Sequence, residues 1–224
     1  MSEWWTYSLS DFLLFSPRTY YRLSELYNIA IWPAQIVMLA LGIAIVLLLR
    51  RSGAWQARAA AVILAASWLF VAWAYLIGHY DTINWAASYF AAAFVLQAVL
   101  LVWTGVVRNR LSLRRRADVA SRAGLGLFLF ALIVEPLIAP LLGRPWTQAE
   151  VFGVAPDPTV VATLGVLTSA ERPHWHLLLV PLLWCALSGA TLWTMQSPEA
   201  LVLPAAAVVA LIVAACKTLP VSQP

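Results

Sequence analysis

Long runs of apolar residues, separated by short polar or basic stretches, dominate this chain. Six of these runs come near the ~20 residues that an α-helix needs to cross a bilayer. They are residues 29–49, 59–77, 85–107, 123–142, 177–193 and 200–216. The pattern predicts an all-α, polytopic transmembrane helical bundle with six spans. Because the connections are short, we expect residues 29–224 to form one bundle without a separate aqueous domain.

The first 28 residues have a different pattern, in which aromatic and aliphatic residues alternate with serine, arginine and acidic residues. Such a segment is typical of an amphipathic helix that lies on the membrane surface. Ser16 and Pro17 predict a helix start, because serine caps free N–H groups and proline fits the first helical turn. The pair Trp32-Pro33 predicts a break between this N-terminal interfacial segment, residues 1–28, and the first span.

Composition and charge support a membrane protein and suggest its orientation. The chain is 62% hydrophobic and 11% charged, against roughly a quarter charged in soluble domains. Arginines flank the first and third connections between runs, whereas the second connection, residues 78–84, has none. By the positive-inside rule the first and third connections face the cytoplasm. We therefore interpret these arginines as topogenic, and expect contact with membrane lipids but no binding of nucleic acid.

The stretch from Arg144 to His176 is too apolar for an aqueous loop and too interrupted for an ordinary span. Asp157 and Pro158 predict a helix start there. A helix over residues 157–170 would rise only ~20 Å at ~1.5 Å per residue, less than the ~30 Å hydrocarbon core. It either re-enters the outer leaflet or crosses as a short seventh helix, and we favour re-entry. Such half-helices often line the ligand pathway of transporters.

Three stretches of the chain resemble a known family: SDFLLFSPRTYYRLSELYNIAIWPAQ, FGVAPDPTVVATLGVL and LLLVPLLWCALSGATLW. They are similar to an uncharacterised family of bacterial integral membrane proteins, a domain of unknown function whose members are sometimes labelled transporter permeases. The resemblance implies a multi-pass protein of the bacterial cytoplasmic (inner) membrane. It implies no catalytic or binding residues.

Glu135 is the strongest candidate functional residue, because it lies well inside the fourth apolar run. A charged group at the bilayer centre costs ~2.5 to 3.5 kcal/mol on insertion scales, and protonation removes most of this cost. A carboxyl group that gains and loses a proton there suits proton coupling or cation binding. The alternative is a permanently protonated glutamate with a structural role. Gln35 and Gln97 also lie within spans, where their amides can bridge helices; with Glu135 and Asp157 they form the predicted transport or proton residues.

Histidines suggest a second kind of site. His79 lies near Asp81 in the second connection, and His174 and His176 alternate just before the fifth run. In an extended segment residues i and i+2 point to the same side, so the last two can hold one metal ion or a haem. If residues 157–170 re-enter, His79 or Asp81 lies on the same side and can join them.

The chain contains no nucleotide-binding glycine loop, GxSxG nucleophile turn, HExxH helix or CxxC pair. We therefore expect no enzymatic activity and no bound cofactor. The leading hypothesis is a small-solute or ion transporter, or a channel-like protein, of the inner membrane that is proton-coupled through Glu135. The alternatives are a membrane redox or cofactor-binding protein that uses the histidines, and a non-catalytic membrane subunit or scaffold. A homo-oligomer or a membrane complex is compatible with each hypothesis.

Overall fold

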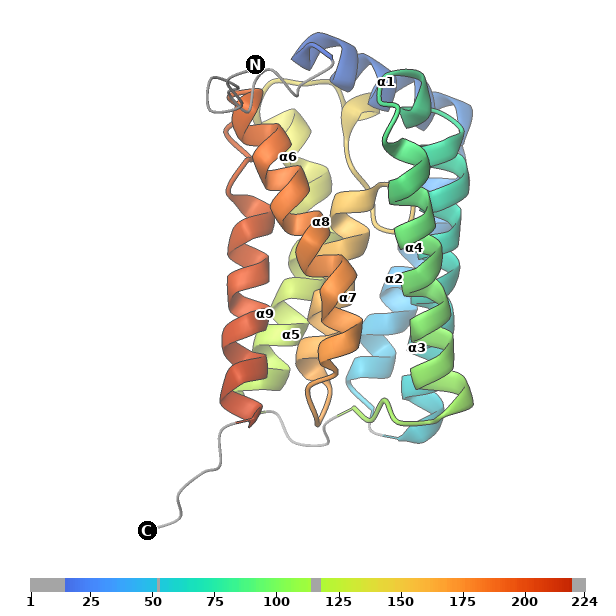
Figure 1. The fold of residues 1–224 in the computed structure, drawn as a ribbon, viewed down its shortest axis with the longest axis vertical. Helices are drawn as coiled ribbons and strands as arrows, with labels where there is room; N and C mark the ends of the chain where they lie inside the picture. Colours follow the sequence, from blue (N-terminus) through green and yellow to red (C-terminus); the bar gives the residue numbers. More distant parts are fainter. Residues whose placement is uncertain (1–14, 52, 114–117, 219–224) are drawn as a thin grey trace, which may run out of the picture.

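The computed structural model describes residues 15–51, 53–113 and 118–218, which form an elongated bundle of helices aligned with its long axis (Figure 1). The helices along the bundle are α2 (Ala34–Leu49), α3 (Ala54–Phe70), α4 (Ala87–Val102), α5 (Val119–Leu129), α6 (Glu135–Leu141), α7 (Pro156–Ser169), α8 (Trp175–Thr194) and α9 (Val202–Thr218). Within these described ranges the strand-like structure is limited to an isolated antiparallel bridge between Leu113 and Ala170. The prediction of an all-α fold is confirmed.

Several helical stretches have the length and composition needed to cross a membrane. Four qualify on their own: Ala54–Thr82, Ala87–Val107, Val119–Leu141 and Trp175–Thr194. A fifth is obtained if α1 (Pro17–Ala30) and α2 are taken as one span, although the two are bent by 88° relative to each other. Helix α9 is apolar but shorter.

Three long stretches contain π-helical turns. Helix α3 continues into η3 (Val71–Ile77), α4 continues into η5 (Trp103–Val107), and η6 (Phe130–Val134) joins α5 to α6. A π turn bonds residue i to residue i+5 and is found frequently at functional sites. The η6 turn directly precedes Glu135, and the next residue, Pro136, has no N–H to continue the ladder. The backbone around Glu135 is therefore less regularly bonded than the rest of its helix.

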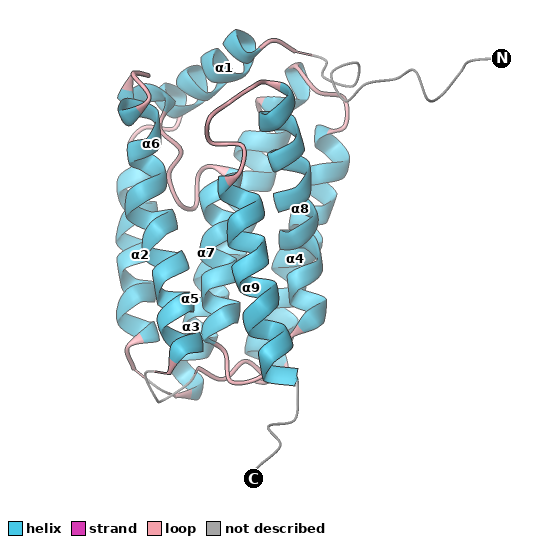
Figure 2. Cartoon of the chain, turned by 90° about the vertical axis from the view of Figure 1, so that its left-hand side faces the viewer, coloured by secondary structure: helices cyan, strands magenta, loops and turns pink. Residues whose placement is uncertain are grey.

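Helix α1 lies across one end of the bundle, which we call the α1 end (Figures 1 and 2). As predicted, Ser16 caps the helix by accepting a hydrogen bond from the Thr19 N–H at 3.2 Å, and Pro17 occupies its first turn. The predicted break at Trp32-Pro33 separates α1 from α2. Residues 1–14 of the predicted interfacial segment lie outside the described residues.

The connection over residues 142–155 descends from the α1 end into the bundle, and α7 continues from there to the opposite end (Figures 1 and 2). We call this opposite end the basic end, because Arg50, Arg108 and Arg172 belong to its connections. The C-terminal end of α7 is held there by the Leu113–Ala170 bridge and by a 2.9 Å hydrogen bond from the Glu171 N–H to the Ser112 carbonyl.

The prediction that residues 157–170 re-enter is therefore wrong. After α7 the chain does not return to the α1 end; α8 begins at the basic end and runs back (Figure 1). The helix alone is too short to traverse the bundle, but the non-helical connection before it covers the remaining depth. Every residue of α7 is buried, and so are residues 151–155 before it. Neighbouring helices therefore enclose this irregular backbone.

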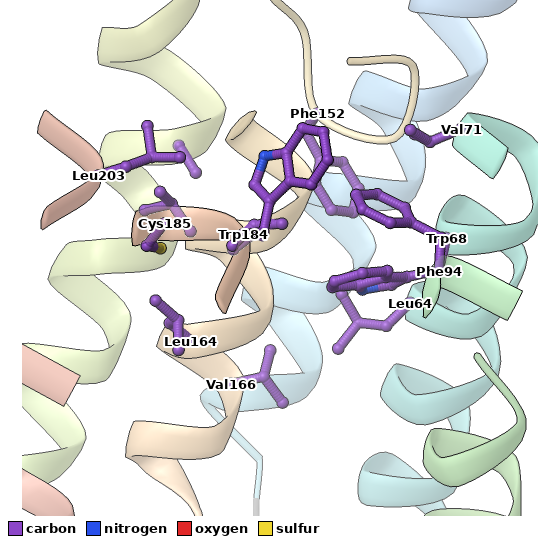
Figure 3. Close-up of a cluster of buried hydrophobic side chains, with 14 of the residues drawn as sticks. Leu64, Trp68, Val71, Phe94, Phe152, Leu164, Val166, Trp184, Cys185 and Leu203 are labelled. Atoms are coloured by element: carbon purple, nitrogen blue, oxygen red, sulfur yellow. The ribbon is translucent and has the colours of Figure 1, made fainter. Parts of the chain in front are cut away.

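Close packing holds α7 at the centre. A Cβ atom on Gly124 of α5 would lie 2.5 Å from the Gly165 carbonyl oxygen of α7, and a Cβ on Gly165 would lie 2.7 Å from the Gly124 carbonyl oxygen. Only glycine lets two helix backbones approach this closely. On the other side of α7, the Trp68 ring lies 4.3 Å from that of Phe94, and Phe94 lies 4.9 Å from Trp184 (Figure 3). Trp68 also donates a 2.8 Å hydrogen bond to the Thr163 hydroxyl.

Candidate functional site: a buried acidic cavity

A small cavity of about 30 Å³ lies where α6, α7, α8 and the start of α9 meet the connection over residues 142–155. A cavity needs roughly 10–15 Å³ of this volume to hold one water molecule. This cavity therefore has room for about two water molecules. We call it the acidic cavity, because four carboxyl groups and a single arginine line it: Glu135, Glu150, Asp157, Glu199 and Arg144. The sequence predicted two of these five residues.

Glu135 is the unsatisfied member of this group. It is the first residue of α6 and only 6% exposed, and both of its side-chain oxygens are buried without a hydrogen-bond partner among the described residues. An ionised carboxylate is costly to bury without hydrogen bonds or a counter-charge. The side chain at this position therefore favours a bound proton or a bound cation.

Asp157, in contrast, is fully bonded. Its Oδ1 accepts a hydrogen bond from Trp184 Nε1 and its Oδ2 accepts one from Ser188 Oγ, both at 2.7 Å. Both donors belong to α8. Asp157 also lies in the first turn of α7, where free N–H groups and the helix dipole favour a negative charge. The prediction of a helix start near Asp157-Pro158 is confirmed, but Asp157 is not its cap: α7 begins at Pro156 with Ala155 as the capping residue, and the Asp157 side chain bonds to α8 instead.

Glu150 lies on the connection over residues 142–155 and meets helix α1. Its Oε1 accepts a hydrogen bond from the Tyr20 hydroxyl at 3.4 Å. Asp157 and Glu199 line the same cavity, so Glu150 joins helix α1 to this group of acids.

Glu199 carries the counter-charge of the cavity. Arg144 Nη2 donates to both Glu199 oxygens, at 2.9 and 2.7 Å, and these are short, charge-assisted hydrogen bonds. Tyr21 of α1 donates to Glu199 Oε1 at 3.1 Å, and its ring lies 4.1 Å below the Arg144 guanidinium carbon. The one arginine of the cavity is therefore committed to one of the four acids.

The two predicted glutamines lie elsewhere. Gln35 Nε2 donates to the Asn28 carbonyl at 2.8 Å, which ties α2 to the end of α1. Gln97 Nε2 donates to the Leu177 carbonyl at 3.0 Å, which ties α4 to α8. The structure brings Glu135 and Asp157 together but places neither glutamine at the cavity. Both amides bridge elements of the fold.

The histidines do not form a common site. His79 lies at the α1 end, where its Nδ1 is 2.8 Å from the Ala74 carbonyl oxygen, and Asp81 is exposed in the short helix η4 (Tyr80–Thr82). His174 and His176 lie at the basic end with ring centroids 6.0 Å apart, and His176 Nε2 is 2.9 Å from the Thr104 hydroxyl. Since the chain crosses the bundle between the two pairs, the length of the bundle separates them. Over residues 15–51, 53–113 and 118–218, no group of three His, Cys, Asp or Glu residues is placed to hold a metal ion.

Sequence reasoning missed Glu150, Glu199 and Arg144 because each lies in a polar connection between apolar runs, where charged residues are ordinary. Their burial follows from the connection itself, whose residues 151–155 are all buried. The usable signal was the apolar stretch VFGVA directly before Pro156, which is unusual for a solvent-exposed loop. Tyr27 of α1 holds this stretch inside the bundle by donating a 2.8 Å hydrogen bond to the Val154 carbonyl.

Comparison with known proteins leaves the site without an assigned role. No curated protein and no solved structure matches the chain. The similarity to an uncharacterised family that the sequence indicated is confirmed. The model of a family of unknown function, DUF6064, matches residues 18–222, and the chain therefore belongs to this family.

Proposed function

We propose that this protein is a multi-pass protein of a bacterial inner membrane that transports a small solute or ion, with Glu135 as its proton or cation site. The observation that carries the proposal is the state of Glu135: both carboxyl oxygens are buried, neither has a hydrogen-bond partner within residues 15–51, 53–113 and 118–218, and the side chain lines a cavity with three further acids. Intramembrane ionisable residues are costly and are usually retained for function.

The arrangement of helices supports a membrane topology with seven passes, one more than the six apolar runs. The passes are α2, α3 with η3, α4 with η5, α5 to α6, the connection over residues 142–155 with α7, α8, and α9. Large apolar side chains such as Ile43, Leu96 and Leu183 are exposed around the bundle, where lipid would cover them. By the positive-inside rule the basic end faces the cytoplasm. The α1 end then lies at the outer face, with α1 in the interface and the acidic cavity below it.

The acidic cavity suits the uptake and release of protons. Carboxyl groups that lie close together in a buried site do not all ionise together, because like charges disfavour the charged form. Arg144 already neutralises Glu199. Glu135, Glu150 and Asp157 therefore favour bound protons, and their exchange is the chemical basis for coupling.

The redox alternative loses its geometric basis, because its histidines lie at opposite ends of the bundle. The scaffold alternative makes a different prediction from the transport hypothesis: it requires no change of protonation at Glu135.

Proton movement into vesicles tests the proposal. The full chain is reconstituted into lipid vesicles that contain a pH-sensitive dye, and an imposed pH gradient is followed with time. We expect Glu135→Gln to abolish the proton flux, since glutamine keeps the shape and removes the titration. The matched control is Glu171→Gln, the same change at an exposed residue of the basic end, which should leave the flux unchanged. Equal flux in wild type and Glu135→Gln would refute the proposal.

A further inference from the structure

A second cavity lies beside the acidic one at the α1 end. It has a volume of about 40 Å³, and its lining includes Tyr20, Tyr75, Tyr80 and Asn84. The Tyr75 and Tyr80 rings stack with centroids 5.7 Å apart, and the Tyr20 ring meets Tyr80 edge-on at 6.4 Å. Asn84 donates a hydrogen bond to the Tyr80 hydroxyl at 3.2 Å. Several hydroxyl groups that can both donate and accept protons thus gather around this cavity.

Tyr20 connects the two cavities. Its ring lines the second cavity, and its hydroxyl donates to Glu150, which lines the acidic one. The Tyr75 ring also lines the second cavity. Tyr20 is only 6% exposed, so bulk water does not replace it in its contact with Glu150. Tyr20 is therefore a polar link between the second cavity and the acidic cavity.

The other contacts between the cavities are less suited to carrying a proton. Ser188 lines the second cavity and bonds to Asp157, but Trp184 holds the other Asp157 oxygen, so both oxygens already accept short bonds. Leu192 lines both cavities and has no polar group. Arg144 and Glu199 also line the acidic cavity, but each is engaged in the ion pair with the other.

We infer that protons enter the acidic cavity from the outer face through this tyrosine cluster, with Tyr20 as the immediate donor to Glu150. This inference rests on the proposed function. The Tyr20 O–H bond breaks as an O–H bond forms on ionised Glu150, and the Tyr20 oxygen takes a replacement proton from a hydronium ion that reaches the second cavity from outside, which leaves as water. Tyr20 is unchanged after the step, and Glu150 has gained one proton.

From Glu150 the proton reaches Glu135 inside the acidic cavity. The charged and titratable groups facing Glu135 are Asp157 on α7, Glu150 on the connection, Glu199 before α9, and Cys185 on α8. Arg144 lines the same cavity but is paired with Glu199. Tyr20 is thus a positioning and relay residue that acts through Glu150, and it does not touch Glu135.

The test separates the rate of proton uptake from its equilibrium. The purified full chain is subjected to a pH jump, uptake is followed by a dye in stopped flow, and the protonated carboxyl groups are measured by infrared difference spectroscopy. We expect Tyr20→Phe to slow uptake by on the order of tenfold or more and to leave the carboxyl signal at equilibrium unchanged. Tyr89→Phe is the matched control, because Tyr89 lies on α4 with 69% of its surface exposed; its uptake should equal that of wild type.

A second variant shows whether slow uptake in Tyr20→Phe has a cause other than misfolding. Glu150→Gln keeps the packing around Tyr20 and removes the acceptor, and it should slow uptake to a similar degree. Wild-type uptake rates in both Tyr20→Phe and Glu150→Gln would overturn the proposed proton route through Tyr20. The proposed function would still stand if Glu135→Gln removes a carboxyl signal. A Glu135→Gln protein with the full wild-type signal and uptake would overturn the proposed function itself.

Discussion

The two ends of the bundle bury opposite kinds of ionisable groups, and both meet the same central helix. At the α1 end, Asp157 lies in the first turn of α7 and accepts bonds from α8. At the basic end, the Lys217 ammonium donates to the carbonyl oxygens of Thr168 and Ala170, at 2.6 and 2.5 Å. A negative charge at the start of a helix and a positive charge at its end both complement the helix dipole. The buried charges are therefore organised around α7.

The ends differ in how far their charges are compensated. Lys217 bonds to carbonyl groups that the end of any helix leaves free, which is a stabilising role. The α1 end holds four acids with one arginine, more negative groups than the fold needs. The carboxyl groups of the acidic cavity are therefore better candidates than Lys217 for protonation changes that are linked to function.

The largest effect is expected at Asp157. Asp157→Ala removes the acceptor of two buried donors, Trp184 Nε1 and Ser188 Oγ, and should lower the free energy of unfolding by about 3 kcal/mol. Thermal unfolding of the purified protein in detergent measures the change. Asp157→Asn retains one acceptor and should lose less, and equal losses in the two variants would contradict this account of the site.

A smaller effect is expected at the other end of α7. Lys217→Met removes the two bonds to the carbonyl groups but keeps the length of the side chain, and it should cost about 1 to 2 kcal/mol. The same unfolding assay compares it with Asp157→Ala. A loss at Lys217 as large as that at Asp157 would show that the two ends do not differ in the way described here.

The pH dependence of stability should reveal His174 at the basic end. Burial, with His176 and Lys217 nearby, lowers the pKa of His174 below its ordinary value of 6.5. The unfolded chain therefore binds a proton first as pH falls through 6.5, and the folded state loses stability on the acid side. His174→Gln should reduce this loss in unfolding experiments at a series of pH values. An unchanged profile would mean that His174 is not responsible.

Prediction from the sequence succeeded where a single residue breaks a pattern. Glu135 and Asp157 stand out because charged residues are rare within apolar runs, and the start of α1 and the break after it follow from Ser16, Pro17 and Pro33. These features are local, so the sequence contains the information needed to find them.

Prediction failed where the outcome depends on packing. The length of residues 157–170 indicated a helix too short to cross, which was correct, but the irregular segment before it completes the crossing because Tyr27 and the surrounding helices bury it. The predictions of where the chain runs after α7 and of a shared histidine site depended on the same assumption, and they failed with it. Glu150 and Glu199 became part of the site for the same reason, and no local pattern marks them.

The glycine contact between α5 and α7 has a mechanical consequence for the acidic cavity. Glu135 continues the stretch that contains Gly124, through η6, and Asp157 belongs to the helix that contains Gly165. Because no side chain fits between the two backbones, neither helix can slide along the other by a turn without a clash. The glycine contact therefore fixes the register of the two helical stretches that carry Glu135 and Asp157.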